Sequence, residues 1–370
     1  SQVQVAIQHA GSVTPVMLTL TRASIHQSAI KRSAMIAPNI GYVALSVFSD
    51  STARELKAAV DSLVKAGATS LTLDLRANPG GLLDQGVAVA DLFLDRGKRI
   101  ASTAGRDSSD DLVFVDTAAQ QWPKLKLAVL VDDKTASAAE VVSGALQDHD
   151  RAVVLGMTTY GKGSVQHVYP VPAGGAVRLT TARWLTPLGR YISHPPPVKG
   201  ADQLDSDPPR PKYHTDAGRT VLGGGGITPD VTIGDTTAPA ENLALMRALG
   251  TNVSLFHDAL TAYALELKAA KTITSPDFAV TRPMLDEIYK RMVARNVDVP
   301  RSTYDAAAPL VSRLFAYEVA RYVFGADAEF RRKAADDKVL IASEKLLAES
   351  QSQADALRRA EAMQRAEPKE

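Results

Sequence analysis

Hydrophobic and polar positions follow two rhythms in the first half of the chain. Short apolar runs of strand length occur at residues 40–48 and 70–75, and between them apolar residues recur every three or four positions. Runs of the first kind are typical of buried strands, and the second rhythm predicts an amphipathic helix from residue 50 or 51 to about 66. Strand, helix and strand at this spacing predict a right-handed βαβ unit with parallel strands. The apolar positions expected on one side of this helix are Leu56, Val60, Leu63 and Val64.

The same alternation continues toward the middle of the chain. An apolar run at 127–131 is followed by a helical pattern at 140–147, and further strands are expected at 152–155 and 176–185. Residues 102–124 are polar and are expected to form a loop with a short strand near 113–115. Strands that alternate with helices predict an α/β fold built on a parallel sheet.

The two ends of the chain have a different pattern. Residues 1–22 alternate at period two on both sides of Gly11, which predicts paired strands that cannot form a stable domain alone. We expect them either to complete the following sheet or to be the end of another module. Residues 238–370 are helical in pattern, and 327–370 predict one long amphipathic helix, either solvated or in contact with a second copy.

These patterns divide the chain into residues 1–22, a core at 23–237 and a helical region at 238–370. Within the core, residues about 192–222 are rich in proline and polar residues and are expected to form an exposed insertion.

Composition narrows the classes of function. The 370 residues carry a formal net charge of +1, which argues against a broad nucleic-acid footprint. The absence of cysteine excludes disulfides, thiolate zinc sites and a cysteine nucleophile. No apolar run is long enough to span a bilayer, and the glycines at 223–226 lack the Lys-Ser/Thr of a phosphate loop, so we expect neither an integral membrane segment nor a cofactor. Because the sequence starts at Ser1 without an initiator methionine, we expect a mature form or a fragment.

Ser137 lies in a turn of small residues where an apolar strand gives way to a helix. The first amides of a helix have no internal partner and carry partial positive charge, so the amide of Ala138 is a candidate donor to a developing oxyanion. The alternative is structural, because Ser137 and Glu140 also fit a capping box.

Lys162 follows 25 residues later between two glycines, and Gln166 follows Lys162. A lysine can act as a general base only when its amine is uncharged, which burial favours and a close carboxylate opposes. An amide such as that of Gln166 can accept a hydrogen bond from a lysine without adding charge. The two side chains would stand about 13 Å apart on a regular strand and about 6 Å apart on a helical turn. A solvated loop lysine remains the plain alternative.

The turn at 76–81 follows the strand at 70–75 and holds Gly80 and Gly81. Glycines permit unusual backbone angles and close approach of a substrate, so their amides are further candidates for an oxyanion hole. The alternative is a plain Pro-Gly turn. Asp74 and Arg76 share one strand face, and we expect them to form a structural pair.

As a set, these residues resemble the C-terminal processing (tail-specific) peptidases of the serine–lysine kind. The resemblance covers about residues 20–235 and rests on motifs at 73–81, 135–140, 144–148, 159–166 and 226–230. It implies a crotonase-like (ClpP/crotonase-type) α/β core with a helical C-terminal region, and residues 1–22 would then be the end of a PDZ domain. It also implies Ser137 as nucleophile, Lys162 as general base and Gln166 as its orienting residue. The implied oxyanion hole is formed by Ala138 and either Gly80 or Gly81.

The function that the resemblance implies is a serine endopeptidase that cleaves proteins near exposed C-terminal tails, in the bacterial cell envelope and most naturally the periplasm. Its partners would be protein or peptide substrates, and its C-terminal helices could join a second copy. A catalytically silent scaffold on the same fold is the alternative. An acyl-CoA enzyme of the crotonase kind is a third hypothesis, but it leaves the lysine unexplained and lacks a suitably placed carboxylate.

Overall fold

The computed structural model describes residues 1–8, 14–23, 25–107, 111–172, 174–194, 210–234 and 238–366. The chain divides into two compact units, one formed by residues 27–234 and 338–370, the other by 1–26 and 235–337. The predicted turn at Gly11 and the proline-rich part of the insertion, residues 195–209, lie outside the described residues.

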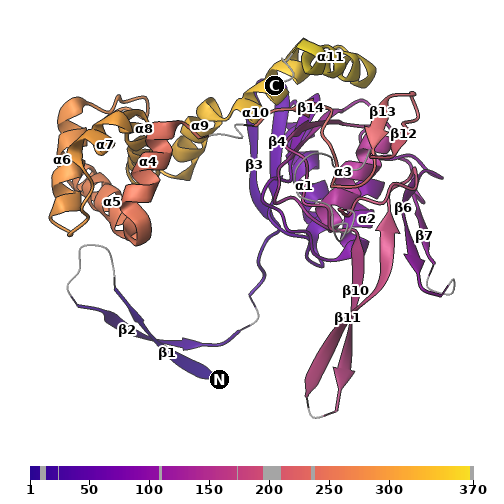
Figure 1. Cartoon of the computed structure of the whole chain (residues 1–370), viewed down its shortest axis with the longest axis horizontal. Helices are drawn as coiled ribbons and strands as arrows, with labels where there is room; N and C mark the ends of the chain where they lie inside the picture. The colour runs from indigo at the N-terminus through magenta and orange to yellow at the C-terminus, as the bar shows by residue number, and fades with distance from the viewer. Residues whose placement is uncertain are drawn as a thin grey trace, which may run out of the picture. The chain divides into compact units, whose positions relative to one another are not determined.

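The main sheet of the first unit has the strand order β14-β9-β8-β5-β4-β3. Its strands β3, β4 and β14 are labelled in Figure 1. Strands β4, β5, β8, β9 and β14 run parallel, and β3 is antiparallel to β4. The predicted βαβ unit is confirmed as β4, α1 and β5. The strands are β3 (Ile30–Ala37), β4 (Ile40–Leu45), β5 (Ser70–Asp74), β8 (Lys126–Val131), β9 (Val153–Gly156) and β14 (Val231–Thr232).

Helices cover both faces of this sheet, as strands buried along their whole length require. Leu71 and Leu73 of β5 join the apolar core that also contains residues of α1 (Thr52–Lys65), α2 (Leu83–Asp91) and α3 (Ala138–Asp148). Thr72, between them, points to the other face and lies 2.9 Å from the Ser343 hydroxyl of α10 (Lys338–Glu349). In α1 the predicted stripe is buried except at Val64, which is exposed because it lies one position beyond Leu63 on the helix.

The end of the chain differs from the prediction of one long helix over 327–370. It forms α9 (Ala326–Asp336), α10 and α11 (Gln353–Ala366). The apolar residues Leu346, Leu347 and Leu357 are buried within the chain, and the Lys126 amine of β8 donates to the carbonyls of Leu347 and Ser350, both at 2.6 Å. Residues 338–366 therefore complete the unit that contains the main sheet, rather than standing in solvent.

A smaller antiparallel sheet has the order β10-β11-β6-β7, from β6 (Arg99–Gly105), β7 (Val113–Val115), β10 (Ser164–Val171) and β11 (Gly175–Leu185). The predicted strand at 113–115 is confirmed. Strand β6 was not predicted, because its serine, threonine and glycine residues look like a loop until pairing with β11 is known. Strands β10 and β11 form a hairpin that extends away from the rest of the sheet (Figure 1). Within the insertion, β12 (Lys212–His214) pairs with β13 (Thr220–Leu222).

In the other unit, β1 (Gln2–Ile7) and β2 (Val16–Thr21) pair antiparallel, as predicted, but form a sheet of their own. They do not complete the main sheet. The helices α4 (Ala240–Leu249), α5 (Val253–Ala270), α6 (Arg282–Val293), α7 (Arg301–Ala306) and α8 (Ala308–Val319) are joined by a core that includes Phe256, Ile288 and Phe315. Among the described residues, no helix combines the length and the apolar character needed to cross a bilayer.

We predict that Leu347→Ala destabilises the main-sheet unit by about 2–5 kcal/mol, because it leaves a cavity beneath α10. Ile341→Ala on the same helix is the control, since Ile341 is 45% exposed and Leu347 is 0% exposed. Urea unfolding measures both. Equal stability of the two variants would contradict the packing of α10 on the sheet.

Candidate active site

Ser137 lies between strand β8 and helix α3 and has a strained backbone. Its φ is 56° and its ψ is −120°, a region that residues with a side chain rarely adopt. It occupies the N-cap position of α3, and its amide donates to Glu140 Oε2 at 2.8 Å, so this part of the predicted capping box is present. A cap does not require such angles, and retained strain of this kind is found mainly at functional sites.

The Glu140 carboxylate joins the turn of Ser137 to the loop of Lys162. Its Oε1 accepts hydrogen bonds from the Thr159 hydroxyl at 2.5 Å and the Gly161 amide at 2.7 Å. Its Oε2 accepts from the Lys162 amide at 2.9 Å as well as from Ser137. Because both amides bond to the same oxygen, the distance between the Ser137 and Lys162 backbone nitrogens cannot exceed the sum of 2.8 and 2.9 Å.

Burial is the largest influence on Glu140 and raises the pKa of its carboxyl above the ordinary value, while the hydrogen bonds from Thr159, Lys162, Gly161 and Ser137 act in the opposite direction. A protonated oxygen would be a donor facing another donor. The arrangement with all four donors in place therefore requires the ionised carboxylate.

The structure brings the chain segments of Ser137 and Lys162 together, and both side chains are half-buried. Within the described residues, no hydrogen bond joins the Ser137 hydroxyl to the Lys162 amine. Gln166 is exposed at a bulge in β10, and its amide donates to the Thr180 hydroxyl at 3.3 Å rather than to either residue. Its predicted role remains a prediction.

The turn at 76–81 lies directly against the turn of Ser137. Asn78 is buried and holds it in place: its side chain donates to the Leu45 carbonyl at 3.0 Å, and its own carbonyl accepts from Ala136 at 2.9 Å. Asn78 Oδ1 also accepts from the Gly80 amide at 2.9 Å, so that donor is engaged. For the amides of Gly81 and Ala138, no acceptor is found among the described residues. The geometry favours Gly81 over Gly80 as an oxyanion donor.

Sequence reasoning missed two residues of this site. Glu140 was expected only as part of a cap, and Asn78 was given no role. The local pattern held no signal for either, because their partners come from other segments of the chain. The predicted pair of Asp74 and Arg76 is confirmed, with Arg76 Nη2 at 2.7 Å from Asp74 Oδ2.

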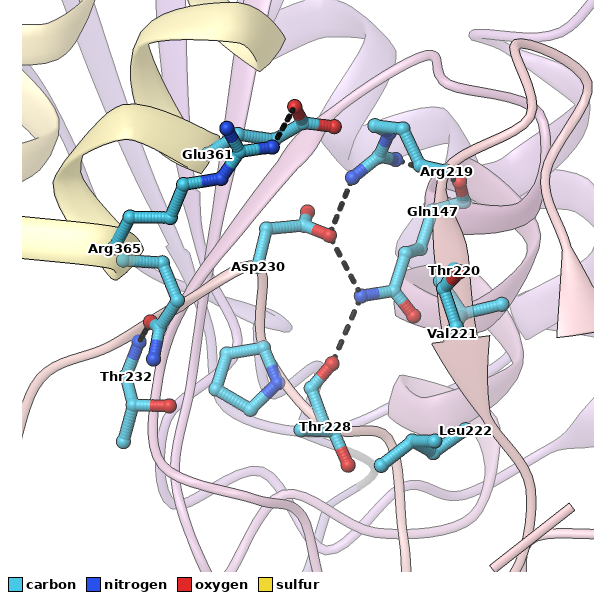
Figure 2. Close-up of a pocket in the computed structure, with 12 residues that line it drawn as sticks. Gln147, Arg219, Thr220, Val221, Leu222, Thr228, Asp230, Thr232, Glu361 and Arg365 are labelled. Carbon is cyan, nitrogen blue, oxygen red and sulfur yellow. Dashed lines mark hydrogen bonds and ion pairs between the residues drawn. The ribbon is translucent and has the colours of Figure 1, made fainter. Parts of the chain in front are cut away.

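The motif at 226–230 contacts the C-terminal end of α3, where Gln147 donates hydrogen bonds to the Thr228 carbonyl and to Asp230 (Figure 2). The side chain of Asp230 is only 6% exposed, and it accepts hydrogen bonds from the Val154 amide at 2.8 Å, from Gln147 at 3.1 Å and from Arg219 at 2.6 Å. Burial raises the pKa of Asp230, while Arg219 opposes that effect. These residues border a cavity of about 300 Å³, roughly 15 Å from Ser137 along the helix. We interpret the motif as an anchor for α3.

We predict that Gly80→Ala destabilises this unit more than Gly97→Ala. Both glycines have positive φ, 90° and 86°, so alanine is strained at either position. A side chain at Gly80 would lie 2.6 Å from the Ala136 carbonyl and 2.7 Å from Ser137 Cβ, whereas nothing lies within 4 Å of one at Gly97. Thermal unfolding should show a cost of about 1–2 kcal/mol at Gly97 and a larger one at Gly80. Equal costs would contradict the close contact of the two turns.

Residues 39–199 match the family model described as Peptidase family S41. The chain is 39% identical over 194 residues to the carboxy-terminal-processing protease of Bartonella bacilliformis, covering 51% of this chain and 44% of that protein. It is 39% identical over 190 residues to the carboxy-terminal processing protease CtpA of Bacillus subtilis; the aligned part is 48% of this chain and 40% of that protein. A probable CtpA-like serine protease of Staphylococcus haemolyticus is 32% identical over 241 residues, which are 64% of this chain and 45% of that protein.

The chain thus spans less than half the length of these relatives. Among solved structures, the photosystem II D1 C-terminal processing protease aligns with a TM-score of 0.43 and 29% identity over 68% of this chain and 60% of that one. The resemblance inferred from the motifs is confirmed by the family model and these relatives. Residues 39–199 thus match peptidase family S41, and about half of the chain is similar to carboxy-terminal processing proteases.

Proposed function

We propose that this chain is the catalytic part of a serine endopeptidase that cleaves polypeptides near their C-terminal tails. Ser137 is the nucleophile, and Lys162 is the general base. The observation that supports this most directly is the strained backbone of Ser137, whose amide donates to the same oxygen of Glu140 as the amide of Lys162. A strained nucleophile, a nearby amine and two open amide donors are the groups that acyl transfer requires.

In the proposed reaction, the Ser137 oxygen attacks the carbonyl carbon of the scissile bond while the neutral Lys162 amine takes the hydroxyl proton. The negative charge moves to the carbonyl oxygen, which accepts hydrogen bonds from the amides of Ala138 and Gly81. The C–N bond then breaks as Lys162 gives its proton to the leaving amine, and Ser137 is left as an acyl ester. Lys162 takes a proton from a water molecule that attacks this ester, and returns it to the Ser137 oxygen as the C–O bond to Ser137 breaks. Gln166 orients the lysine once its amide turns from Thr180.

Glu140 is compatible with a neutral lysine despite its charge. A carboxylate with free lone pairs would bind an ammonium group and favour the charged form of the lysine. Both oxygens of Glu140 already accept two hydrogen bonds each from described residues. In this proposal, the carboxylate binds the backbone amide of Lys162 and leaves the side-chain amine for catalysis.

The family resemblance extends the proposal to the rest of the protein. The core is proposed to be crotonase-like, which is consistent with a parallel sheet whose strand β5 ends at the oxyanion turn. The hairpin β1–β2 is proposed to be the end of a PDZ domain. Proteins with exposed C-termini are the proposed substrates, and the bacterial periplasm is the proposed location. The C-terminal helices are a proposed contact between copies.

We predict that Ser137→Ala and Lys162→Met each reduce cleavage of a loosely folded protein by about four orders of magnitude, as expected when either member of a catalytic pair is lost. Methionine keeps the length of the lysine side chain without its amine. Lys134→Met is the control, since Lys134 is an exposed lysine near Ser137 in the chain. Circular dichroism checks folding. Undiminished turnover in either active-site variant would refute the assignment.

We predict that Glu140→Gln lowers activity by about 100-fold, because the Gln amide group would face N–H donors and displace Ser137 from Lys162. Ser143→Ala on the same helix is the control, since Ser143 bonds only within α3 among the described residues.

In the unmodified protein, protonation of Glu140 should have the same effect. Because burial raises the pKa of Glu140, activity should fall on acidification before the pH reaches a glutamate's ordinary value of about 4.3. The Gln variant should lack that part of the pH profile. A fully active Gln variant would show that the carboxylate does not position the site.

A further inference from the structure

The hairpin β10–β11 has one apolar face that nothing in the described residues covers. Residues directly opposite each other in an antiparallel pair point to the same side, as do alternate residues along a strand. Tyr169 pairs with Val177 and His167 with Leu179, so these four share a face. Tyr169 is 47% exposed, Val177 43% and Leu179 52%. The opposite face carries the pairs of Val168 with Arg178 and Gln166 with Thr180.

A groove of about 540 Å³ adjoins this face. Tyr169 and His167 line the groove together with Val165, Leu83 and Phe114. Val165 follows Lys162 by three residues, and Leu83 follows Gly81 by two. The groove and the apolar face of the hairpin therefore share His167 and Tyr169, and the groove is also lined by residues that closely follow the two candidate catalytic loops in the chain.

Exposed apolar side chains gathered on one side of a hairpin mark an interaction surface more often than chance. The spacing of this surface suits an extended polypeptide, because both the hairpin and an extended chain present side chains at period two. Strand β10 also lies at the edge of its sheet, paired on one side with β11, so its outer edge can accept a further strand.

We propose that the apolar face of β10–β11 is a docking surface for the substrate polypeptide, which lies extended from the groove along the hairpin with apolar side chains at alternate positions. Eight residues of β10 span roughly 26 Å, so the face can hold about eight residues of substrate. This docking surface is separate from any PDZ domain and acts on the part of the substrate next to the cleaved bond. The inference rests on the proposed peptidase function.

The test measures binding apart from catalysis. Ser137→Ala protein is titrated with a fluorescent peptide of twelve residues in which valine or leucine alternates with serine. In that background, Tyr169→Thr and Leu179→Thr change the apolar face, and Val168→Thr changes an equally exposed position, 58%, on the opposite face. Threonine preserves strand propensity, and circular dichroism confirms folding. We expect the double variant Tyr169→Thr/Leu179→Thr to raise Kd at least tenfold and Val168→Thr to change it less than twofold.

The active protein provides a second readout. Against an unfolded protein substrate, the double variant should raise KM at least tenfold with kcat within twofold, while hydrolysis of a short ester that does not reach the hairpin stays unchanged. Unchanged peptide affinity in the double variant, or equal weakening by Val168→Thr, would overturn the docking surface. A double variant that sediments as a smaller particle but binds peptide normally would also overturn it, because the face would then join copies of the chain.

The two proposals fail in different ways. Peptide binding that the double variant weakens, in a protein that never cleaves, supports the docking surface and refutes the peptidase assignment. Cleavage that the hairpin variants do not change supports the peptidase assignment and refutes the docking surface.

Discussion

The candidate site depends on the buried carboxylate of Glu140. Two segments meet there, the first turn of α3 and the loop that carries Thr159, Gly161 and Lys162. Glu140 binds the backbone of Ser137 within its own helix and the backbone of Gly161 and Lys162 from the following loop. A buried carboxylate without partners would be strongly destabilising, whereas one with four donors fixes the donors as much as they stabilise it. Replacing it by an apolar residue would leave those backbone amides unpaired.

The same carboxylate relates the strain at Ser137 to the position of Lys162. The backbone of Ser137 can remain in an unfavourable region only if its surroundings over-determine it. Glu140 holds its amide, and the close packing of Gly80 against Ser137 Cβ and the Ala138 nitrogen leaves the turn no room to relax. Gly80 itself is fixed by Asn78, which also binds strand β4 through the Leu45 carbonyl. The position of the hydroxyl therefore follows from contacts with the ends of β4, β5 and α3 rather than from Ser137 alone.

Much of this architecture could be predicted because its signals are local. Apolar runs gave the parallel strands β4, β5, β8 and β9, and the change from strand to helix gave the position of Ser137. What was missed depends on contacts between distant segments. Residues 338–366 look like a solvated helix until the sheet face that they cover is known, because one of the contacts is between two small polar side chains, those of Thr72 and Ser343. Glu140 looks like an ordinary cap until Gly161 and Lys162 are placed beside it. Neither contact leaves a periodic pattern in the sequence.

Helix α3 is held by buried charges at both ends, and this explains why the motifs lie where they do. At its C-terminal end, Asp148 pairs with Arg190 with both side chains fully buried, and Gln147 donates to Asp230. Those contacts attach the helix to β9, β14 and the segments around the insertion, while Glu140 attaches its first turn to the lysine loop. A helix fixed in this way cannot shift along its axis without breaking ion pairs that are costly to separate in a buried setting. Adjustment on substrate binding is therefore expected in the elements that lack such anchors, namely the bulged start of β10 and the hairpin beyond it, which also carry Gln166.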